Sequence, residues 1–437
     1  MTDLAFPKGF LWGTATAAHQ VEGNNTNTDW WDWEQVPGHV RNGDRSGLAC
    51  DQWHRYEEDF DLAASMGNNA HRLGVEWARL EPRPGEWSGE AFAHYRQVLQ
   101  ALRRRGLEPM VTLHHFVNPR WFVAGGGWES PGAVRLFERY TRRVMEELGD
   151  LVTLWCTLNE PGGYVYHGWV SGDWPPQRKS LGAAWQVLKH LLLAHAASYR
   201  AIHDANPSAQ VGIAHHWRIF DPADPGALLD RWGARFRDAV LNRPVLDAQV
   251  AGKVDLALGL AAHLPEVHGT FDYLGLNYYH REHVAFDLRQ PAFAFTTALP
   301  SPDRQEGMPE WFADVYPEGL HRLSMRLSAY GKPIYITENG LLDNTDERRP
   351  AYILHHLTAV HRAIQEGAPV LGYFYWSLLD NFEWAEGYAT RFGLVHTDFQ
   401  SQKRTMKRSG LLYGEICRTN GITDDMVARY APQLGLA

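Results

Sequence analysis

The segment of residues 152–160 reads V-T-L-W-C-T-L-N-E and indicates the fold class. It is a short apolar run rich in β-branched and aromatic residues, which is typical of a strand buried on both faces. The run stops at two polar residues, Asn159 and Glu160. Residues 333–340, P-I-Y-I-T-E-N-G, repeat the pattern and place Glu338 near the end of the run. Buried strands that finish in polar side chains indicate a parallel α/β barrel, because the carboxyl ends of its strands form the active site.

Six further runs of the same kind lie on either side of these two. They are near-continuous apolar stretches instead of strict alternations, as expected for strands that helices cover on the outside and side chains fill on the inside. The eight predicted strands are residues 11–18, 70–77, 109–116, 152–160, 210–216, 273–279, 333–340 and 370–377.

Amphipathic stretches occupy the intervals between the predicted strands. In each, apolar residues recur three or four positions apart, and each ends near a Gly or Pro, which favours helices. The clearest predicted helices are residues 90–105, 132–148, 183–204 and 350–367. Repeated βα units around a parallel sheet predict an α/β fold, a single (β/α)8 TIM barrel.

The barrel is expected to use the whole chain. No linker or low-complexity segment interrupts residues 1–437, and an α/β barrel with long loops can reach this length, so one catalytic domain is predicted. The two longest connections, residues 24–46 and 280–318, are rich in Gly, Pro, Asp and Trp. We interpret them as active-site loops that shape the mouth of the barrel.

The overall composition narrows the class of protein. With 44% hydrophobic and 21% charged residues, the 437-residue chain can bury a large core. A formal net charge of -9, without clusters of Lys and Arg, argues against a nucleic-acid partner. The 18 Trp, 18 Tyr and 18 Phe suit stacking on the C–H faces of sugars as well as core packing. A neutral small-molecule substrate is therefore favoured.

The cysteines and the apolar segments indicate a cellular compartment. Cys50, Cys156 and Cys417 contain no C-x-x-C pair and predict neither a disulfide framework nor a zinc site. The opening M-T-D-L-A-F-P-K-G-F lacks the basic and apolar regions of a secretory signal. The most apolar helical stretch, residues 181–197, is interrupted by polar residues and is too short to span a bilayer. We expect a cytoplasmic protein that has no membrane partner.

Two carboxyls, Glu160 and Glu338, end the fourth and seventh predicted strands. Strands on opposite sides of a narrow barrel can bring two carboxyls to face each other across its mouth. Hydrolysis of an acetal with retention needs such a pair roughly 5 Å apart, one to protonate the leaving oxygen and one to attack the anomeric carbon. These two groups and water suffice, so no cofactor and no metal is predicted. For either Glu alone, a helix cap or an ion pair is the simpler interpretation.

Four long motifs follow one another along the chain. They are F-P-K-G-F-L-W-G-T-A-T-A-A-H-Q-V-E-G at the start, T-L-N-E-P around Glu160, Y-I-T-E-N-G around Glu338 and W-S-L-L-D-N-F-E-W near the end. Together they resemble glycoside hydrolase family 1, the β-glucosidase family, over nearly the whole chain. The resemblance implies a retaining β-glycosidase, a β-glucosidase of broad tolerance that acts on small β-glycosides and oligosaccharides. It implies Glu160 as general acid/base and Glu338 as nucleophile.

The resemblance also implies a set of sugar-binding residues. They are Gln20, His115, Asn159, Trp376, Glu383 and Trp384. Gln20 ends the first predicted strand and would grip distant hydroxyls together with Glu383, since an amide and a carboxylate offer both donors and acceptors. His115 corresponds to a family residue on the 3-hydroxyl and Asn159 to one on the 2-hydroxyl. The two Trp correspond to the floor under the ring and a donor at its far edge.

Three supporting residues are implied next to the two carboxyls. Arg72 and Tyr279 correspond to the family pair that contacts the nucleophile, and Asn277 to a residue close to the acid/base carboxyl. A cation beside Glu338 is expected to keep that carboxylate ionised, whereas Glu160 needs a raised pKa to begin as an acid.

Three positions depart from the commoner family pattern. His114 and Phe116 flank the motif His, where an aromatic residue and Trp are common, and Phe116 lacks the indole N–H that would reach the 3-hydroxyl. Glu76 stands where a small residue is frequent. These departures resemble a branch of the family with broader glucosidase, galactosidase and fucosidase activities.

Two alternatives share the same scaffold. A 6-phospho-β-glycosidase would carry a Ser near Glu383 and a downstream Ser, Lys and Tyr that bind the phosphate. This chain reads E-W-A-E-G-Y-A-T-R-F-G there, and Glu383 would repel a phosphate. A catalytically silent sugar-binding barrel is the second alternative, although both carboxyls are present.

A metal-dependent barrel hydrolase is a third alternative, suggested only by three His doublets at residues 114–115, 215–216 and 355–356. Adjacent residues on a strand point to opposite sides, so one doublet cannot supply two ligands to one ion. We interpret His114 and the third doublet as packing or surface residues. One member of the second doublet is expected to line the pocket.

The leaving-group side of the site is expected around Trp169 and Trp311 and the loops that carry them. Capture of the glycosyl-enzyme by a sugar alcohol in place of water would give transglycosylation by the same mechanism. Neither the sugar preference nor the oligomeric state follows from the sequence.

Overall fold

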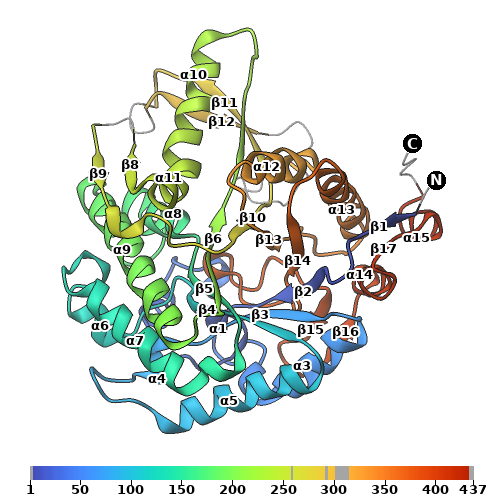
Figure 1. Cartoon of the computed structure of the whole chain (residues 1–437), viewed down its shortest axis with the longest axis horizontal. Helices are drawn as coiled ribbons and strands as arrows, with labels where there is room; N and C mark the ends of the chain where they lie inside the picture. The colour runs from blue at the N-terminus through green and yellow to red at the C-terminus, as the bar shows by residue number, and fades with distance from the viewer. Residues whose placement is uncertain (1–2, 257–258, 291–293, 301–313, 433–437) are drawn as a thin grey trace.

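The computed structural model describes residues 3–256, 259–290, 294–300 and 314–432. Eight parallel strands close into a barrel, as the sequence predicts (Figure 1). The barrel strands are β2 (Leu11–Ala15), β3 (Ala70–Gly74), β4 (Glu108–His114), β5 (Leu154–Asn159), β6 (Gln210–His216), β10 (Leu274–Asn277), β13 (Ile334–Asn339) and β14 (Val370–Trp376).

Helices connect the strands and surround the barrel. The four clearest predictions are confirmed, with ends shifted by one or two residues. The helices are α1 (Ala18–Val21), α2 (Asp29–Glu34), α3 (Gln52–Ser65), α4 (Trp77–Leu80), α5 (Gly89–Arg104), α6 (Arg120–Ala124), α7 (Ala133–Leu148), α8 (Pro161–Val165), α9 (Leu181–Ala205), α10 (Leu228–Arg237), α11 (Arg243–Ala251), α12 (Glu318–Ser328), α13 (Arg349–Gln365), α14 (Arg408–Thr419) and α15 (Asp424–Tyr430). Two π-helical segments, Tyr166–Ser171 and Asp238–Asn242, follow α8 and α10.

Local sequence explains where the long helices begin. Ser88 precedes α5 and accepts a hydrogen bond from the Ala91 N–H at 3.1 Å, and Ser180 caps α9 in the same way. A hydroxyl at this position satisfies an amide that has no partner within the helix. The buried residues of α5 recur three or four apart, so one face of the helix packs on the barrel.

Each barrel strand pairs with the next one along the chain, and β14 closes the barrel on β2. The ladders are irregular near the carboxyl ends of β5, β10 and β13, with register shifts between Cys156 and Asn159, between Leu276 and Asn277, and between Ile336 and Asn339. Such irregularities bend a strand and redirect its side chains. They lie where the predicted site residues leave the strands.

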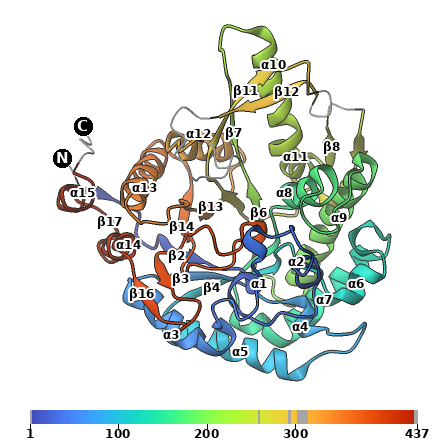
Figure 2. The same ribbon diagram turned by 180° about the vertical axis from the view of Figure 1, so that it is seen from behind.

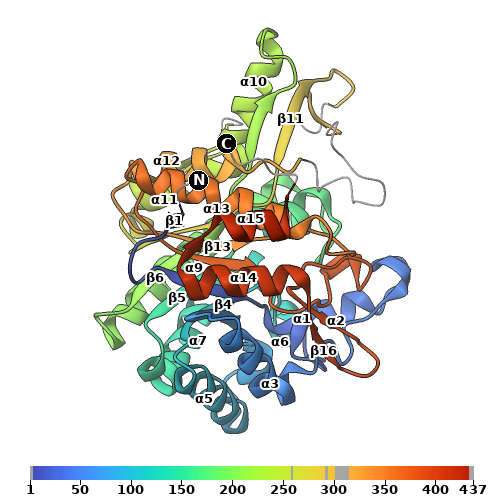
Figure 3. The same cartoon turned by 90° about the vertical axis from the view of Figure 1, so that its right-hand side faces the viewer.

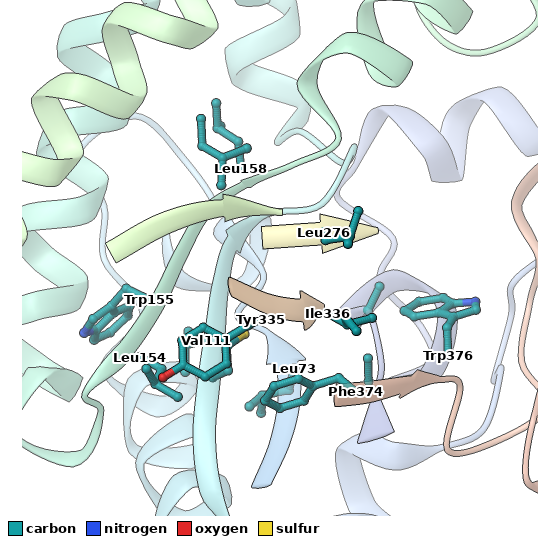
Figure 4. Packing of buried hydrophobic residues seen from close by; sticks show 14 of the residues in the cluster. Leu73, Val111, Leu154, Trp155, Leu158, Leu276, Tyr335, Ile336, Phe374 and Trp376 are labelled. Carbon is teal, nitrogen blue, oxygen red and sulfur yellow. The ribbon is translucent and has the colours of Figure 1, made fainter. Parts of the chain in front are cut away.

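Apolar side chains from the barrel strands form the centre of the core. Figure 4 shows residues from β3, β4, β5, β10, β13 and β14 packed together, among them Leu73, Val111, Leu158, Leu276 and Ile336. Each of these five side chains is at most 5% exposed. The strands are therefore buried on both faces, as their near-continuous apolar sequences predict.

The two connections that we interpreted as loops contain regular structure. Residues 24–46 include α2, and residues 280–318 include the antiparallel pair β11 (Arg281–Phe286) and β12 (Thr296–Leu299). Together with β7 (Ile219–Pro222), this pair forms a three-stranded sheet. The charged residues of β11 hide its strand pattern in the sequence, because they are paired with other charges in the fold.

The sheet of β7, β11 and β12 and helix α10 project beyond the barrel, on the side opposite α3 and α5 (Figures 1 and 2). A short hairpin of β8 (Lys253–Asp255) and β9 (Ala261–His263) follows α11.

The two ends of the described chain meet. β1 (Leu4–Ala5) pairs antiparallel with β17 (Gly421–Ile422), and α14 and α15 lie against α13 (Figure 3). In the C-terminal part, β15 (Val395–Thr397) and β16 (Arg404–Met406) form an antiparallel hairpin.

A substitution at Gly340 tests how closely β13 and β14 approach each other. A Cβ at this position would lie 1.8 Å from the Trp376 carbonyl oxygen, which is backbone and cannot rotate away. We expect Gly340→Ala to lower the free energy of unfolding by at least about 2 kcal/mol. Because β13 and β14 must move apart, kcat/KM should also fall at least about tenfold. Denaturation and steady-state kinetics measure both effects.

Gly89→Ala is the matched control, because a Cβ at the start of α5 meets nothing within 4 Å. It should leave activity unchanged and stabilise the protein slightly, by up to about 1 kcal/mol. Equal stability of Gly340→Ala and the wild type would contradict this account of the packing.

Candidate active site

A cavity of about 800 Å³ opens at the carboxyl ends of the barrel strands. Eight of the predicted site residues line its inner end. They are His115, Asn159, Glu160, Tyr279, Glu338, Trp376, Glu383 and Trp384. Gln20, Arg72 and Asn277 lie one layer deeper and contact residues that line the cavity. The predicted set is therefore brought together in one place.

Glu160 follows β5 directly and precedes α8. Its backbone is left-handed, with φ 42° and ψ 55°, and Pro161 begins the helix after it. A residue other than Gly adopts this conformation rarely, and such strain is concentrated at functional sites. Among the other cavity residues, Phe116, Trp384 and Ala294 also have positive φ, at 70°, 48° and 51°. The surrounding fold holds these side chains in positions that a relaxed chain would not favour.

Glu338 lies within β13 and is 3% exposed. The Arg72 guanidinium donates to its Oε1 at 2.5 Å, and the Tyr279 hydroxyl donates to its Oε2 at 2.6 Å. Arg72 itself is 1% exposed. The Arg72 guanidinium and the Glu338 carboxyl therefore form a buried ion pair joined by a short hydrogen bond.

A chain of hydrogen bonds connects the two carboxyls. The second guanidinium nitrogen of Arg72 donates to the side-chain Oδ1 of Asn159 at 2.6 Å, and the Asn277 side-chain amide donates to the same oxygen at 3.2 Å. The Asn277 amide also donates to Glu160 Oε1 at 2.9 Å. Because these residues come from β3, β5 and β10, the barrel itself fixes the relative positions of Glu160 and Glu338.

Glu160 lies in a different electrostatic environment from Glu338. Burial raises the pKa of Glu160 to about 8, and the negative charge of Glu338 adds to the effect. Hydrogen bonding by Asn277 and the more distant guanidinium groups offset it only in part. The raised pKa favours the protonated form of Glu160 at neutral pH, whereas Glu338 contacts a buried cation.

Gln20 and Glu383 form a polar pair at the inner end of the cavity. The Gln20 side-chain amide donates to Glu383 Oε2 at 3.3 Å, to Asn381 Oδ1 at 3.1 Å and to the Phe382 backbone carbonyl oxygen at 2.9 Å. The buried Gln20 Oε1 has no partner. Burial, and then the charge of Glu338, raises the pKa of Glu383 to about 8. A hydroxylated ligand can satisfy the free acceptor.

We expected Gln20 to end a strand, and this expectation is wrong. β2 stops at Ala15, and Gln20 belongs to the short helix α1. The intervening small residues carry no strand or helix periodicity, so the sequence does not reveal this boundary.

Aromatic rings line the cavity between the Glu160–Glu338 pair and the Gln20–Glu383 pair. The His115 ring stacks on Trp376 at 5.8 Å and on Trp384 at 5.9 Å between ring centroids. His115 Nε2 accepts a hydrogen bond from the Asn159 amide at 3.1 Å, and its Nδ1 is buried without a partner. Phe116 packs against Trp384 and against Trp174, a cavity residue that the sequence did not single out. Flat apolar faces beside free polar atoms suit a sugar ring.

Glu76 does not reach the cavity. Its carboxyl accepts hydrogen bonds from the Ala78 N–H at 3.3 Å and the Asn25 amide at 2.8 Å, so it caps helix α4. The departure at this position therefore acts through the packing behind the sugar end.

The second His doublet divides as strand geometry requires. His215 lies against the Asn242 carbonyl oxygen at 3.0 Å, whereas His216 lines the cavity with Nδ1 3.5 Å from Glu160 Oε2. Burial, with the charge of Arg218, holds the pKa of His216 well below its usual range, so the ring is neutral. His216 is the functional neighbour of Glu160 that sequence reasoning left without a role.

His114 and the third His doublet agree with our interpretation of them as packing or surface residues. His114 does not line the cavity, and its Nε2 lies 3.1 Å from the side-chain Oδ1 of Asn118, while His356 is buried in α13. Across the described residues, no three His, Cys, Asp or Glu side chains group so that they could hold a metal ion. The described helices likewise include none whose length and apolarity would suffice to cross a bilayer.

Trp169 was expected on the leaving-group side, and this expectation is wrong. The side chain is 3% exposed, packs on Tyr164 and donates its indole N–H to Glu129 at 2.9 Å. Its place in the π-helical turn after α8 directs it inward, which the sequence could not show. Trp311 lies outside the described residues.

Comparison with known proteins agrees with the geometry. Residues 2–422 match the family model of glycosyl hydrolase family 1. The chain is 34% identical to the 1,4-beta-D-glucan glucohydrolase of Thermotoga neapolitana, over 96% of this chain and 99% of that protein. Its fold is similar to that of the beta-glycosidase from Pyrococcus horikoshii, with a TM-score of 0.91, 39% identity and coverage of 99% and 100% of the two chains.

A Thermotoga maritima beta-glucosidase in complex with glucoimidazole has a TM-score of 0.90 and 32% identity, with 96% of this chain and 100% of that chain covered. Both the sequence and the structural relationships extend over almost the full length of each protein. The chain therefore belongs to glycosyl hydrolase family 1.

Proposed function

We propose that the chain hydrolyses β-D-glucosides, and also β-D-galactosides and β-D-fucosides, with retention of configuration. Glu338 is the nucleophile and Glu160 the general acid/base. The observation that carries this proposal is the opposite environment of the two carboxyls: Arg72 lies 2.5 Å from Glu338, whereas burial raises the pKa of Glu160 to about 8.

In the first step, Glu338 attacks the anomeric carbon, and the bond to the leaving oxygen breaks. Glu160 transfers its proton to that oxygen, so that the leaving group departs as an alcohol. The ionised Glu338 carboxylate is already held in one orientation by Arg72 and Tyr279. A preorganised nucleophile avoids the cost of reorienting during the reaction.

In the second step, Glu160 is a carboxylate and removes a proton from water. The resulting hydroxide oxygen attacks the anomeric carbon from the side that the leaving group vacated, and Glu338 is released. Two inversions restore the original configuration. The negative charge on Glu338 disappears while it is esterified, so Glu160 becomes a stronger acid at the moment when it must give up its proton.

Positioning of the sugar follows from the free polar atoms. Gln20 Oε1 and the Glu383 carboxyl would bind the distal hydroxyls, and His115 Nδ1 would bind the 3-hydroxyl. Asn159, fixed by Arg72, would bind the 2-hydroxyl, and Trp376 would support the ring.

The remaining assignments belong to the same proposal. The substrates are small β-glycosides and oligosaccharides, and residues 1–437 act as one catalytic domain. Location in the cytoplasm is supported by three buried cysteines that form no disulfide.

A small external nucleophile should restore activity to a variant that lacks the Glu338 carboxyl. We expect Glu338→Gly to lower kcat for p-nitrophenyl β-D-glucoside by about 10^4-fold or more, because the covalent route is lost. Azide should restore turnover by entering the vacated space and should give the α-glucosyl azide. Nuclear magnetic resonance of the product measures the configuration.

Glu386→Gly is the control, since Glu386 also lines the cavity but lies beyond Glu383. Azide should not accelerate this variant. Activity of Glu338→Gly close to the wild-type level without azide would show that the nucleophile has been assigned wrongly.

The pH dependence should reveal the state of Glu160. Because this carboxyl must begin protonated, kcat/KM for a substrate that needs acid assistance, such as phenyl β-D-glucoside, should fall as pH rises through about 8. Glu383 has a raised pKa in the same range, so a variant is needed to assign the basic limb.

Glu160→Gln cannot lose a proton and should abolish the basic limb. Its first step with 2,4-dinitrophenyl β-D-glucoside, whose leaving group needs no proton, should survive, while activity on phenyl β-D-glucoside falls at least about 100-fold. A basic limb at the same pH in Glu160→Gln would assign it to another group and contradict the proposed role.

A further inference from the structure

A second buried histidine, His19, stacks on Trp384 in addition to His115. His19 belongs to α1, one residue before Gln20, and is 1% exposed. Its ring is nearly parallel to the Trp384 indole, with an interplanar angle of 5° and 6.0 Å between the ring centroids. Offset stacking of this kind is a favoured arrangement of two aromatic rings. Because His19 is not among the described residues that line the cavity, it can act on a bound sugar only through neighbours such as Trp384.

One ring nitrogen of His19 is held by Asn25. The Asn25 side-chain amide nitrogen lies 3.2 Å from His19 Nδ1 and also donates to Glu76 Oε2 at 2.8 Å. An amide nitrogen can only donate, so Nδ1 is the acceptor and the ring proton is on Nε2. Glu76 is one of the departures from the commoner family pattern, and its contact with Asn25 connects that departure to His19.

The other ring nitrogen of His19 faces a buried carboxyl. Nε2 lies 3.7 Å from Oε2 of Glu34, a residue of α2 that is 3% exposed. Within the part of the chain that the structure describes, neither atom has a hydrogen-bond partner. The other oxygen of Glu34 accepts from the Ser46 hydroxyl at 2.7 Å, which fixes the carboxyl. The edge of the His19 ring is therefore held between Asn25 and Glu34, and the ring cannot turn without disturbing buried polar groups.

Trp384 depends on its neighbours because its backbone is strained. Its φ is 48°, in the left-handed region that residues other than Gly rarely adopt. Such a conformation persists only where the surrounding structure holds it. His19 on α1 supplies one contact, and Trp30 on α2, with its ring centroid 4.7 Å from that of Trp384, supplies another. The two helices lie next to each other and together support the indole (Figures 2 and 3).

We infer that His19 is a positioning residue, which sets the place of the Trp384 indole against the sugar and so adjusts which sugars are hydrolysed. This inference rests on the proposed function, in which the Trp384 indole N–H donates to a hydroxyl at the far edge of the sugar. A hydrogen bond weakens steeply when its donor is misaligned. A displaced indole would therefore lose that bond, while Gln20 and Glu383 would still hold the distal hydroxyls.

A double-mutant cycle between His19 and Trp384 tests whether one residue acts through the other. We measure kcat/KM for p-nitrophenyl β-D-glucoside in the wild type, in His19→Ala, in Trp384→Phe and in the double variant. We expect His19→Ala to lower kcat/KM at least about fivefold in the wild type but less than about twofold in Trp384→Phe, because the N–H that His19 positions is already absent there.

Relative rates on two sugars separate positioning from general destabilisation. A β-D-glucoside and a β-D-fucoside that compete in one preparation meet the same folded molecules, so the ratio of their kcat/KM values does not depend on the folded fraction. His19→Ala should change this ratio at least about threefold. His195→Ala is the matched control, since His195 is 0% exposed on α9 and its ring nitrogens lie 2.6 Å from the Thr157 hydroxyl and the Thr270 carbonyl oxygen. It should lower the stability and keep the ratio.

Asn25→Ala is a milder variant, because it keeps the His19 ring and removes only the donor to Nδ1. It should change the ratio in the same direction as His19→Ala, by a smaller factor. An equal effect of His19→Ala in both backgrounds, or an unchanged ratio in both His19→Ala and Asn25→Ala, would overturn the inference.

Binding of glucoimidazole, the ligand of the Thermotoga maritima relative, separates the inference from the proposed function. The same cycle is measured in Kd by calorimetry. Coupling in Kd without hydrolysis of β-glycosides supports the positioning role and contradicts the proposed function. Additive effects in Kd and in kcat/KM, with normal hydrolysis by the wild type, leave the proposed function standing and remove His19 from it.

Discussion

The site depends on the hydrogen bonds that the buried Arg72 guanidinium makes to the neighbouring strands. Arg72 is 1% exposed and donates to Thr112, Asn159, the Thr337 carbonyl oxygen and Glu338. These contacts join β3 to β4, β5 and β13 near their carboxyl ends. A buried charge is costly unless it is fully paired, so the surrounding strands must hold their positions closely. The barrel supplies that rigidity, and Arg72 uses it to orient the Glu338 carboxyl.

The same arrangement sets the protonation of the other carboxyls. Glu160, Glu338 and Glu383 share one buried cavity, and Arg72 contacts only Glu338 among them. Burial and the charge of Glu338 raise the pKa of Glu160 and of Glu383 to about 8. Direct contact with one cation thus distinguishes Glu338 from Glu160, whose carboxyl lacks a comparable partner.

Much of this arrangement can be predicted from the sequence, for a physical reason. Strands buried on both faces leave near-continuous apolar runs, and the polar residues that end them mark the rim of the barrel. The eight strands and the position of Glu160 and Glu338 at that rim can therefore be predicted. Features that depend on contacts between distant segments were missed. Charges in β11 concealed a strand, His216 gained its role only through the proximity of β6 to β5, and the turn that buries Trp169 has no sequence signal.

The most direct test of the account is to trap the covalent intermediate. In 2,4-dinitrophenyl 2-deoxy-2-fluoro-β-D-glucoside the fluorine replaces the hydroxyl whose hydrogen bonds strengthen in the transition state, so both steps slow, while the good leaving group keeps the first step possible. Mass spectrometry of the intact chain should show one fluoroglucosyl group, and peptide mapping should place it on Glu338. Attachment to Glu160 or Glu383, or dinitrophenolate release without a labelled chain, would contradict the assignment of Glu338 as the nucleophile.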